Sequence, residues 1–238
     1  MTASADVRIG SAALGAEDRR SCGPAAYATK DPGYFAGARA DFIKLLPDNP
    51  NAAILEIGCG TGATGRLALQ GGKAGRYVGV ELFEAAAAQA RRVLSDVIVG
   101  DIEKLEVELA PCTFDALILS EVLEHLVDPW TVVRRLAPLI RPGGKVLASS
   151  PNVAHRRVVL ELLRGRFDLA DQGVFDRTHM RWFTPTSYRA MFEAAGIAVT
   201  SVGPVTPFST RTRILSRLTG GRFDHLFMVQ IALIGHRR

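Results

Sequence analysis

The sequence predicts an α/β domain built on a doubly wound, mostly parallel sheet. Two observations lead to this fold class. Apolar runs of strand length alternate with helix-like segments between residues 53 and 149, and such alternation builds right-handed βαβ units. A glycine-rich turn follows the first of these runs, as in many α/β domains that bind a ligand at the end of their first strand. With 238 residues, 47% of them hydrophobic and 22% charged, the chain suits one domain of ordinary size.

The expected elements follow one another in a regular order. An amphipathic helix over 34–46 precedes the sheet and ends at Pro47. Strands are expected at 53–57, 77–80, 97–99, 114–119, 146–149, 199–202 and 227–234, which together give a seven-stranded sheet. The helices between them are expected at 63–69, 83–94, 121–139 and 186–195.

Two segments interrupt this alternation. Residues 152–184 (the first insertion) are polar, arginine-rich and irregular, and residues 204–225 (the second insertion) contain a short helix expected at 214–218. Residues 1–22 are small, polar and aperiodic, so we expect a loosely ordered N-terminus followed by a single domain over 23–238. Because ligands of open α/β sheets bind beyond the carboxyl ends of the strands, both insertions are expected to border the substrate site.

Charge is divided unevenly along the chain. The net charge is +5, but residues 1–150 carry −2 and residues 151–238 carry +7, with all thirteen basic residues of the second part being arginine. Arginine binds carboxylate and phosphate bidentately, so an anionic acceptor is one interpretation and an ordinary solvated surface is the other.

No apolar run is long enough to cross a membrane, and no secretory signal is visible. Three cysteines without C-x-x-C spacing disfavour disulfides and a cysteine zinc site. We therefore expect a cytoplasmic protein without a membrane partner.

The glycine-rich turn and two later acids predict a nucleotide-like cofactor site. The turn reads Glu-Ile-Gly-Cys-Gly-Thr-Gly over 56–62; its glycines allow the backbone to approach a ligand closely. Glu81 ends the second strand, where a carboxylate can accept from both hydroxyls of a ribose. Asp101 follows the third strand and can accept from an adenine amino group. The turn lacks the third glycine at the dinucleotide spacing, which disfavours NAD.

These motifs, with Gly100-Asp101-Ile102 and the Arg-Pro-Gly-Gly turn at 141–144, resemble the ordered motifs of class I S-adenosylmethionine (SAM)-dependent methyltransferases over about 34–203. The resemblance implies a Rossmann-like fold, transferase activity and SAM as cofactor. It implies that Gly58 and Gly60, after the motif's first acid Glu56, border the methionine moiety, Glu81 binds ribose, Leu82 and Ile102 sandwich adenine, Asp101 holds the adenine amino group, and Ser120 borders the sulfonium.

Arg39 is a further candidate cofactor contact. Its distance from the glycine turn resembles that of the arginine which pairs with the SAM carboxylate in ubiquinone-pathway O-methyltransferases. The alternative is a charge on the surface of a helix.

The segment Ser-Glu-Val-Leu-Glu-His over 120–125 is the second informative motif. A helix that starts near Glu121 would bring Glu121, Glu124 and His125 to one face, which is half of a divalent-metal site. This E-x-x-E-H segment is similar to one in the ubiquinone-pathway enzymes and in small-RNA 3′-terminal 2′-O-methyltransferases. In the latter a downstream histidine completes a metal site, and His179 is the candidate here. The ion would be Mg, Mn or Zn. A metal-free catalytic base at His125, or a purely structural role, are the alternatives.

The predicted reaction is O-methylation, with N-methylation second, of a small polar or glycosylated metabolite that is anionic on the arginine interpretation. Residues 150–183 resemble a bacterial subgroup associated with secondary-metabolite or cell-surface polysaccharide pathways. Two alternatives belong to other classes: a metal-dependent RNA 3′-terminal 2′-O-methyltransferase, and a non-catalytic SAM-binding regulator. The chain carries no added RNA-binding domain, which disfavours a nucleic-acid partner. No oligomeric state is predicted.

Overall fold

The computed structural model describes residues 37–105 and 110–238. Its core is one seven-stranded sheet with the order β3-β2-β1-β4-β5-β7-β6. Strands β1 to β5 pair in parallel, while β7 runs antiparallel to both of its neighbours. The predicted fold class is therefore confirmed. The strands are β1 (Ala53–Ile57), β2 (Arg76–Glu81), β3 (Asp96–Val99), β4 (Phe114–Ser120), β5 (Ile140–Pro151), β6 (Ile197–Pro204) and β7 (Gln230–Arg237).

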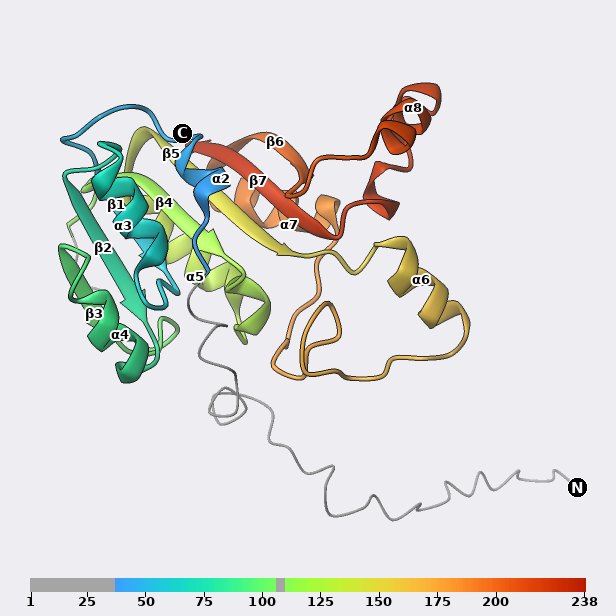
Figure 1. Ribbon diagram of the computed structural model, residues 1–238, viewed down its shortest axis with the longest axis horizontal. Helices are drawn as coiled ribbons and strands as arrows, with labels where there is room; N and C mark the ends of the chain where they lie inside the picture. Colours follow the sequence, from blue (N-terminus) through green and yellow to red (C-terminus); the bar gives the residue numbers. More distant parts are fainter. Residues whose placement is uncertain (1–36, 106–109) are drawn as a thin grey trace, which may run out of the picture.

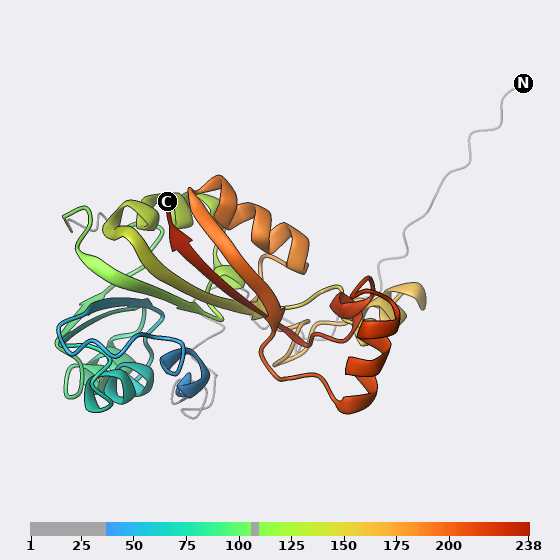
Figure 2. The same ribbon diagram turned by 90° about the horizontal axis from the view of Figure 1, so that it is seen from above.

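Helices cover both faces of the sheet (Figure 2). Alternate residues of the buried strands enter two separate cores: Ile54 packs with Phe42 and Ala68 on one face, and Leu55 packs with Val132 and Phe192 on the other. The first face carries α2 (Ala40–Ile43), α3 (Ala63–Gln70) and α4 (Glu84–Ala90), and the second carries α5 (Pro129–Leu136) and α7 (Pro185–Ala194). The expected N-terminal segment 1–22 and the first residues of the helix predicted over 34–46 lie outside the described residues.

The prediction of one continuous helix over 121–139 is wrong. Glu121 has a left-handed backbone with φ of +54°, and a single 3-10 turn, η3 (Leu123–His125), follows it. The α-helix begins only at Pro129, and it is succeeded by a second 3-10 turn, η4 (Ala137–Leu139). The physical reason is the cap: the Asp128 side chain accepts from the Thr131 amide at 3.0 Å, and proline favours the first helical position.

Both insertions contain a helix, and both helices lie at the end of the molecule where β5 terminates (Figure 1). The first insertion holds α6 (Arg156–Leu163), which was expected to be irregular. The second holds α8 (Thr210–Leu218), which is longer than the helix predicted at 214–218, and the 3-10 turn η5 (Asp224–Leu226) follows after a short turn. None of the helices in the described ranges is sufficiently long and apolar to cross a membrane.

The two ends of the first insertion are held side by side. The Asn152 side chain is fully buried and donates to the carbonyls of His225 (2.7 Å) and Met228 (2.8 Å). The Val153 amide donates to the Phe183 carbonyl at 3.0 Å. The chain therefore leaves β5 and enters α7 at neighbouring points.

Candidate functional site

A large cavity of about 870 Å³ lies beyond the carboxyl ends of β1, β2 and β4. The first insertion and the start of β7 complete its wall. Every residue proposed from the sequence as a cofactor or metal contact lines this single cavity: Arg39, Glu56, Gly58, Gly60, Glu81, Leu82, Asp101, Ile102, Ser120, Glu121, Glu124, His125 and His179.

The turn after β1 is held tightly against its neighbours. Gly58 has a φ of +71°, and a Cβ built there would lie 2.5 Å from Val122 Cγ2. Its amide donates to the Val80 carbonyl at 2.8 Å. The Gly60 amide donates to Glu81 Oε2 at 2.8 Å. Glycine is required at position 58 because both the backbone conformation and the available space exclude a side chain.

Glu81 has two structural partners and remains an acceptor. Its Oε2 binds the Gly60 amide, and its Oε1 accepts from the Phe83 amide at 3.0 Å. Because each carboxylate oxygen has further lone pairs, the side chain can hold the turn and still accept from a ligand in the cavity.

The loop after β3 supplies a second acceptor and apolar surface. Asp101 Oδ1 accepts from the Glu103 amide (3.0 Å), and its Oδ2 lies 2.9 Å from the Nζ of Lys104, which is 84% exposed. An ion pair with so exposed a partner is weak. Ile102 and Leu82 add apolar surface to the wall, and Leu82 is 37% exposed although it is large and apolar. This part of the wall suits a flat apolar ring with a polar edge.

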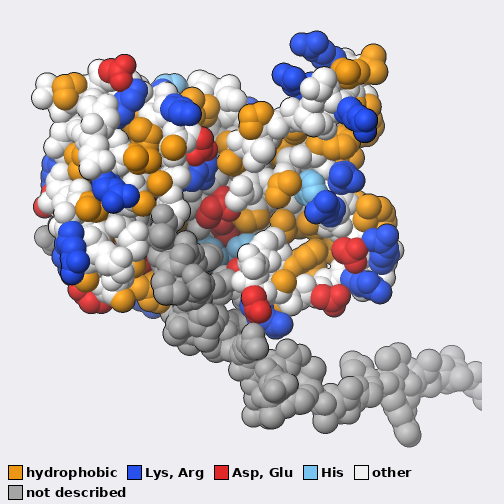
Figure 3. Space-filling model, in the orientation of Figure 1, with side chains coloured by type: hydrophobic (Ala, Val, Ile, Leu, Met, Phe, Trp, Pro, Cys, Tyr) orange, Lys and Arg blue, Asp and Glu red, His pale blue; other side chains and the backbone are white. Residues whose placement is uncertain are grey.

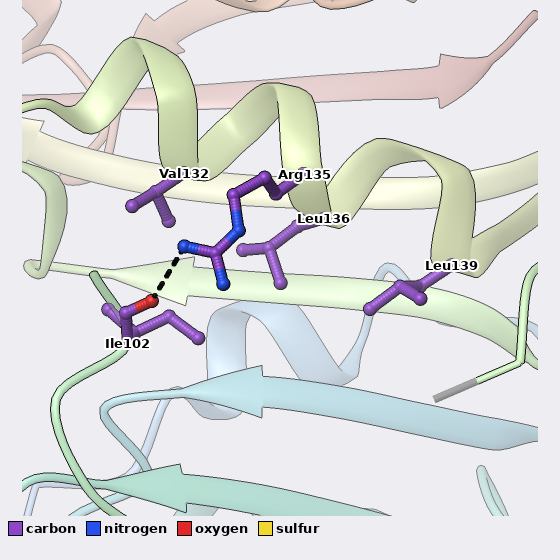
Figure 4. A pocket seen from close by; sticks show the side chains of 5 residues that line it. All are labelled: Ile102, Val132, Arg135, Leu136 and Leu139. Carbon is purple, nitrogen blue, oxygen red and sulfur yellow. Dashed lines mark hydrogen bonds between the residues drawn. The ribbon is translucent and has the colours of Figure 1, made fainter. Parts of the chain in front are cut away.

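Arg135 fastens the same loop to α5 (Figure 4). Its guanidinium donates to the carbonyls of Ile102 (3.4 Å) and Glu103 (3.1 Å). The gap between these elements is only about 40 Å³, which is the size of a water rather than of a ligand. The residues in Figure 4 therefore support the loop that lines the large cavity, and the gap between them is not a second ligand site.

Glu56 is a buried carboxyl group whose pKa lies close to neutral pH. Its Oε2 accepts from the Tyr77 hydroxyl at 2.9 Å. Burial raises the pKa of Glu56 to about 7, against the opposing effects of hydrogen bonds from Tyr77 and Thr64 and of the Arg39 charge. A substantial part of the Glu56 population is therefore protonated at neutral pH.

Arg39 lies on the cavity wall with its donors engaged by the protein. Its Nη1 donates to the hydroxyls of Ser120 and Ser149, each at 2.6 Å. Its Nε and Nη2 donate to the two carboxylate oxygens of Asp41, at 2.9 and 2.7 Å. The guanidinium thus adjoins Ser120, and in this structure Asp41 is its carboxylate partner.

Two histidines from distant segments meet at the cavity. The rings of His125 and His179 have centroids 4.8 Å apart. His125 Nδ1 lies 3.2 Å from the Thr178 carbonyl, and His179 Nδ1 lies 3.1 Å from the Val174 carbonyl. A proton on each Nδ1 satisfies these contacts and leaves the lone pair on Nε2, which is the usual arrangement of metal-binding histidines.

Glu124 joins these histidines. One potential ligand atom from each of Glu124, His125 and His179 lies within 4.8 Å of the other two. Glu124 is buried; its Oε2 accepts from the Ser150 hydroxyl (3.2 Å), while its Oε1 has no hydrogen-bond partner among the described residues. Burial, and then the nearby Glu121 carboxylate, raise the pKa of Glu124 well above its ordinary value. One carboxylate with two imidazoles is a donor set that suits a divalent transition metal.

Glu121 lies near Glu124 but is not one of the three residues whose ligand atoms converge. Its Oε2 accepts from Gln230 Nε2 at 3.0 Å, and burial raises the pKa of Glu121. Three of the four residues proposed as ligands from the sequence therefore come together, and the fourth faces β7.

Sequence reasoning missed the contact that brings His179 into place. The Glu124 carbonyl accepts from the amides of Met180 (2.8 Å) and Arg181 (3.0 Å), which fastens the end of the first insertion to η3. Ser149 and Ser150 were also missed as site residues. Two hydroxyls at the carboxyl end of an otherwise apolar strand were the signal that could have found them.

Comparisons with known proteins agree with this geometry. A family model described as a methyltransferase domain matches residues 31–202. The ubiquinone biosynthesis O-methyltransferase of Aeromonas salmonicida is 27% identical over 186 residues, covering 74% of each chain. The enzyme of the same name from Chromobacterium violaceum is 28% identical, covering 75% of this chain and 78% of that one.

Solved structures with a similar fold include two methyltransferases. The SAM-dependent methyltransferase from Mesorhizobium loti has a TM-score of 0.59 at 18% identity, covering 83% of this chain and 96% of that one. Phosphoethanolamine N-methyltransferase 2 of Haemonchus contortus, in complex with SAM, has a TM-score of 0.58 at 16% identity, covering 83% and 52%.

Proposed function

The chain belongs to the methyltransferase-domain family and is a class I SAM-dependent methyltransferase, and from this premise we propose that it methylates a hydroxyl group of a small polar or glycosylated metabolite. The observation that carries the choice of oxygen is the group formed by Glu124, His125 and His179 on the cavity wall. A hydroxyl must lose its proton as it is methylated, which requires a base or a metal. The relatives named as O-methyltransferases support the same choice.

The residues of the cavity fit SAM. The glycine turn lines the cavity at Gly58 and Gly60, Glu81 keeps acceptor capacity beside it, and Leu82 and Ile102 offer apolar surface next to Asp101. We assign the cofactor contacts to Gly58, Gly60, Glu81, Leu82, Asp101 and Ile102, with Arg39, Glu56 and Ser120 around its other end. When bound, SAM supplies an electrophilic methyl group whose leaving group needs no proton.

The chain itself orients the acceptor and removes a proton. Alignment of two reactants in one cavity can lower a barrier by roughly 7–11 kcal/mol. Residues of the first insertion, among them Thr178 and His179, line the same cavity as the glycine turn. Without a bound metal, His125, oriented through Nδ1 by the Thr178 carbonyl, would take the acceptor's proton on Nε2 as a general base.

We further assign a divalent ion to Glu124, His125 and His179. The Oε1 of Glu124 supports this assignment, because it is a buried oxygen without a hydrogen-bond partner in the described part of the chain. An ion held there would lower the pKa of an acceptor hydroxyl. Two imidazoles favour Zn or Mn over Mg.

Transfer of label tests the proposed reaction. The protein is incubated with methyl-labelled SAM and a desalted extract of its native cells, with and without a chelator, and the products are fractionated. Label in small molecules, or in the saccharides attached to them, is expected, and the chelator should abolish it. Label in RNA would replace this proposal by the RNA 3′-terminal reaction. Full activity after chelation would overturn the metal assignment and leave His125 as a metal-free base.

A further inference from the structure

A second, smaller cavity of about 290 Å³ lies between the start of α6 and the chain that leads into α8. These elements belong to the first and the second insertion, at the end of the molecule beyond β5 (Figure 1). In Figure 3, Lys and Arg side chains and hydrophobic side chains lie close together on this part of the surface. The residues around the cavity are His155, Arg156, Arg157, Thr206, Pro207, Phe208, Ser209, Thr212, Phe227, Val229 and Gln230.

The two cavities adjoin. Val229 and Gln230 line both of them. Gln230 also donates to the carboxylate of Glu121 at 3.0 Å, so this side chain stands between the smaller cavity and the end of the larger one that holds Glu121. A molecule that occupies that end of the large cavity can therefore extend past Gln230 into the smaller one.

The smaller cavity has a positive charge that the protein does not neutralise. Arg156 and Arg157 are exposed, and within 37–105 and 110–238 neither forms an ion pair with an acid. No carboxylate from these two ranges lines the cavity. By contrast, Arg164 at the other end of α6 lies 2.8 Å from Glu161. Burial and the charges of Arg156 and Arg157 lower the pKa of His155, which agrees with a local positive potential.

The remaining wall combines apolar and hydroxyl side chains. Phe208, Phe227 and Val229 supply apolar surface, and Thr206 supplies a hydroxyl. The Arg156 guanidinium lies 5.9 Å from the centre of the Phe227 ring. A volume near 290 Å³ is at the lower limit of the roughly 300–1,000 Å³ found for small-molecule sites, so it suits part of a ligand better than a whole one.

We propose that this cavity binds an oxyanion group, a phosphate or a carboxylate, carried by the methyl acceptor at a distance from the atom that is methylated. The inference rests on the proposed function and names its substrate class. Two guanidinium groups recognise such oxyanions by paired hydrogen bonds, and the adjoining apolar wall holds the piece of the acceptor that bears the charge.

Anion binding tests the cavity without any turnover. Line broadening in phosphorus NMR reports binding of inorganic phosphate, and competition by citrate compares a carboxylate with it. The wild type and a charge-matched control, Arg66→Gln with Arg92→Gln, should bind equally, because these exposed arginines line neither cavity. Arg156→Gln with Arg157→Gln should weaken binding at least tenfold. Equal binding by that variant and by the control would overturn the proposal.

Label transfer then connects the cavity to the acceptor. The product formed by the wild type should be retained on an anion-exchange resin. Arg156→Gln with Arg157→Gln should raise the KM for that acceptor at least tenfold with SAM affinity unchanged. The double variant Arg156→Lys with Arg157→Lys should have a KM between those of the wild type and the glutamine variant. Label only in an uncharged product overturns this inference and leaves the methyltransferase proposal intact. Label in no small molecule while phosphate still binds at the two arginines overturns the proposed function instead.

Discussion

The imidazoles of His125 and His179 lie with their ring centroids 4.8 Å apart, although one follows β4 and the other lies near the end of the first insertion. Each Nδ1 contacts a backbone carbonyl, so both rings are fixed by main-chain atoms rather than by each other. Glu124 completes the group. The acceptor side of the cavity therefore depends on a contact between two segments that are distant in sequence.

Replacing His179 tests the assigned metal. His179→Ala should lower methyl transfer at least about 100-fold, since even the partners that orient metal ligands contribute 10–100-fold. Elemental analysis should show loss of the bound ion, and excess Zn or Mn should not restore activity. His236→Ala is the control, because His236 contacts the Gly143 carbonyl and lies outside the large cavity. A variant that keeps both its metal content and its activity would remove His179 from the assignment.

Replacing the two acceptor side chains tests the cofactor assignment. Glu81→Gln and Asp101→Asn should each weaken SAM binding by about 1.5–3 kcal/mol, the usual contribution of a hydrogen bond to a charged group, or roughly 10–150-fold. Calorimetric titration measures the affinity. Asp96→Asn serves as the control, because Asp96 pairs with Arg76 on the exposed end of β3. Unchanged affinity in both test variants would refute the assignment.

A side chain at position 58 should be costly for two separable reasons. Gly58→Ala combines a left-handed backbone, which costs about 1–2 kcal/mol, with an overlap against Val122 that costs about 1–3 kcal/mol more. Gly72→Ala shares the first effect only, since Gly72 has a φ of +66° and open space around its Cβ position. Adding Val122→Ala to Gly58→Ala should remove the overlap and restore that part of the unfolding free energy, which denaturant unfolding measures. No recovery would contradict the overlap.

The buried carboxyl of Glu56 makes stability depend on pH. Its pKa is about 7 in the folded protein, against 4.5 for an unperturbed glutamate, so its contribution is fully present below pH 4.5 and is lost as pH rises through 7. Relative to Glu56→Gln, the wild type should lose about 3 kcal/mol of unfolding free energy across this window. Denaturant unfolding of the unliganded protein at several pH values measures it.

Tyr77→Phe supplies a second variant for the same measurement. The Tyr77 hydroxyl donates to Glu56 and favours the charged form. Its removal should therefore extend the window to higher pH. Parallel stability profiles for the wild type and Glu56→Gln would show that the carboxyl does not titrate in this range.

The sheet could be predicted from the sequence because its signals are local. Four of the five residues over 53–57 are apolar, as in a buried parallel strand, and the structure gives β1 the same bounds. The placement of the cofactor candidates together was also predictable, since the carboxyl ends of parallel strands lie at one edge of the sheet. Their common cavity follows from that geometry.

The acceptor side could not be predicted in the same way. The spacing of Glu121, Glu124 and His125 suggested one helix face, but the positive φ at Glu121 and the cap at Asp128 divide the segment. Helix α6 was not predicted, and only Val158 on it is buried. The meeting of His125 with His179 depends on backbone contacts across the fold, which no local pattern encodes.

The contacts that Asn152 and Val153 make with backbone carbonyls have a consequence for how the acceptor preference of this enzyme can change. Since the first insertion begins after β5 and ends before α7 at points joined by the contact of Val153 with Phe183, its length can change at little entropic cost. Segments between these contacts and the turn that carries His179 can be exchanged without moving the strands. New acceptor preferences can thus be acquired by replacing part of the first insertion while the rest of the domain stays unchanged.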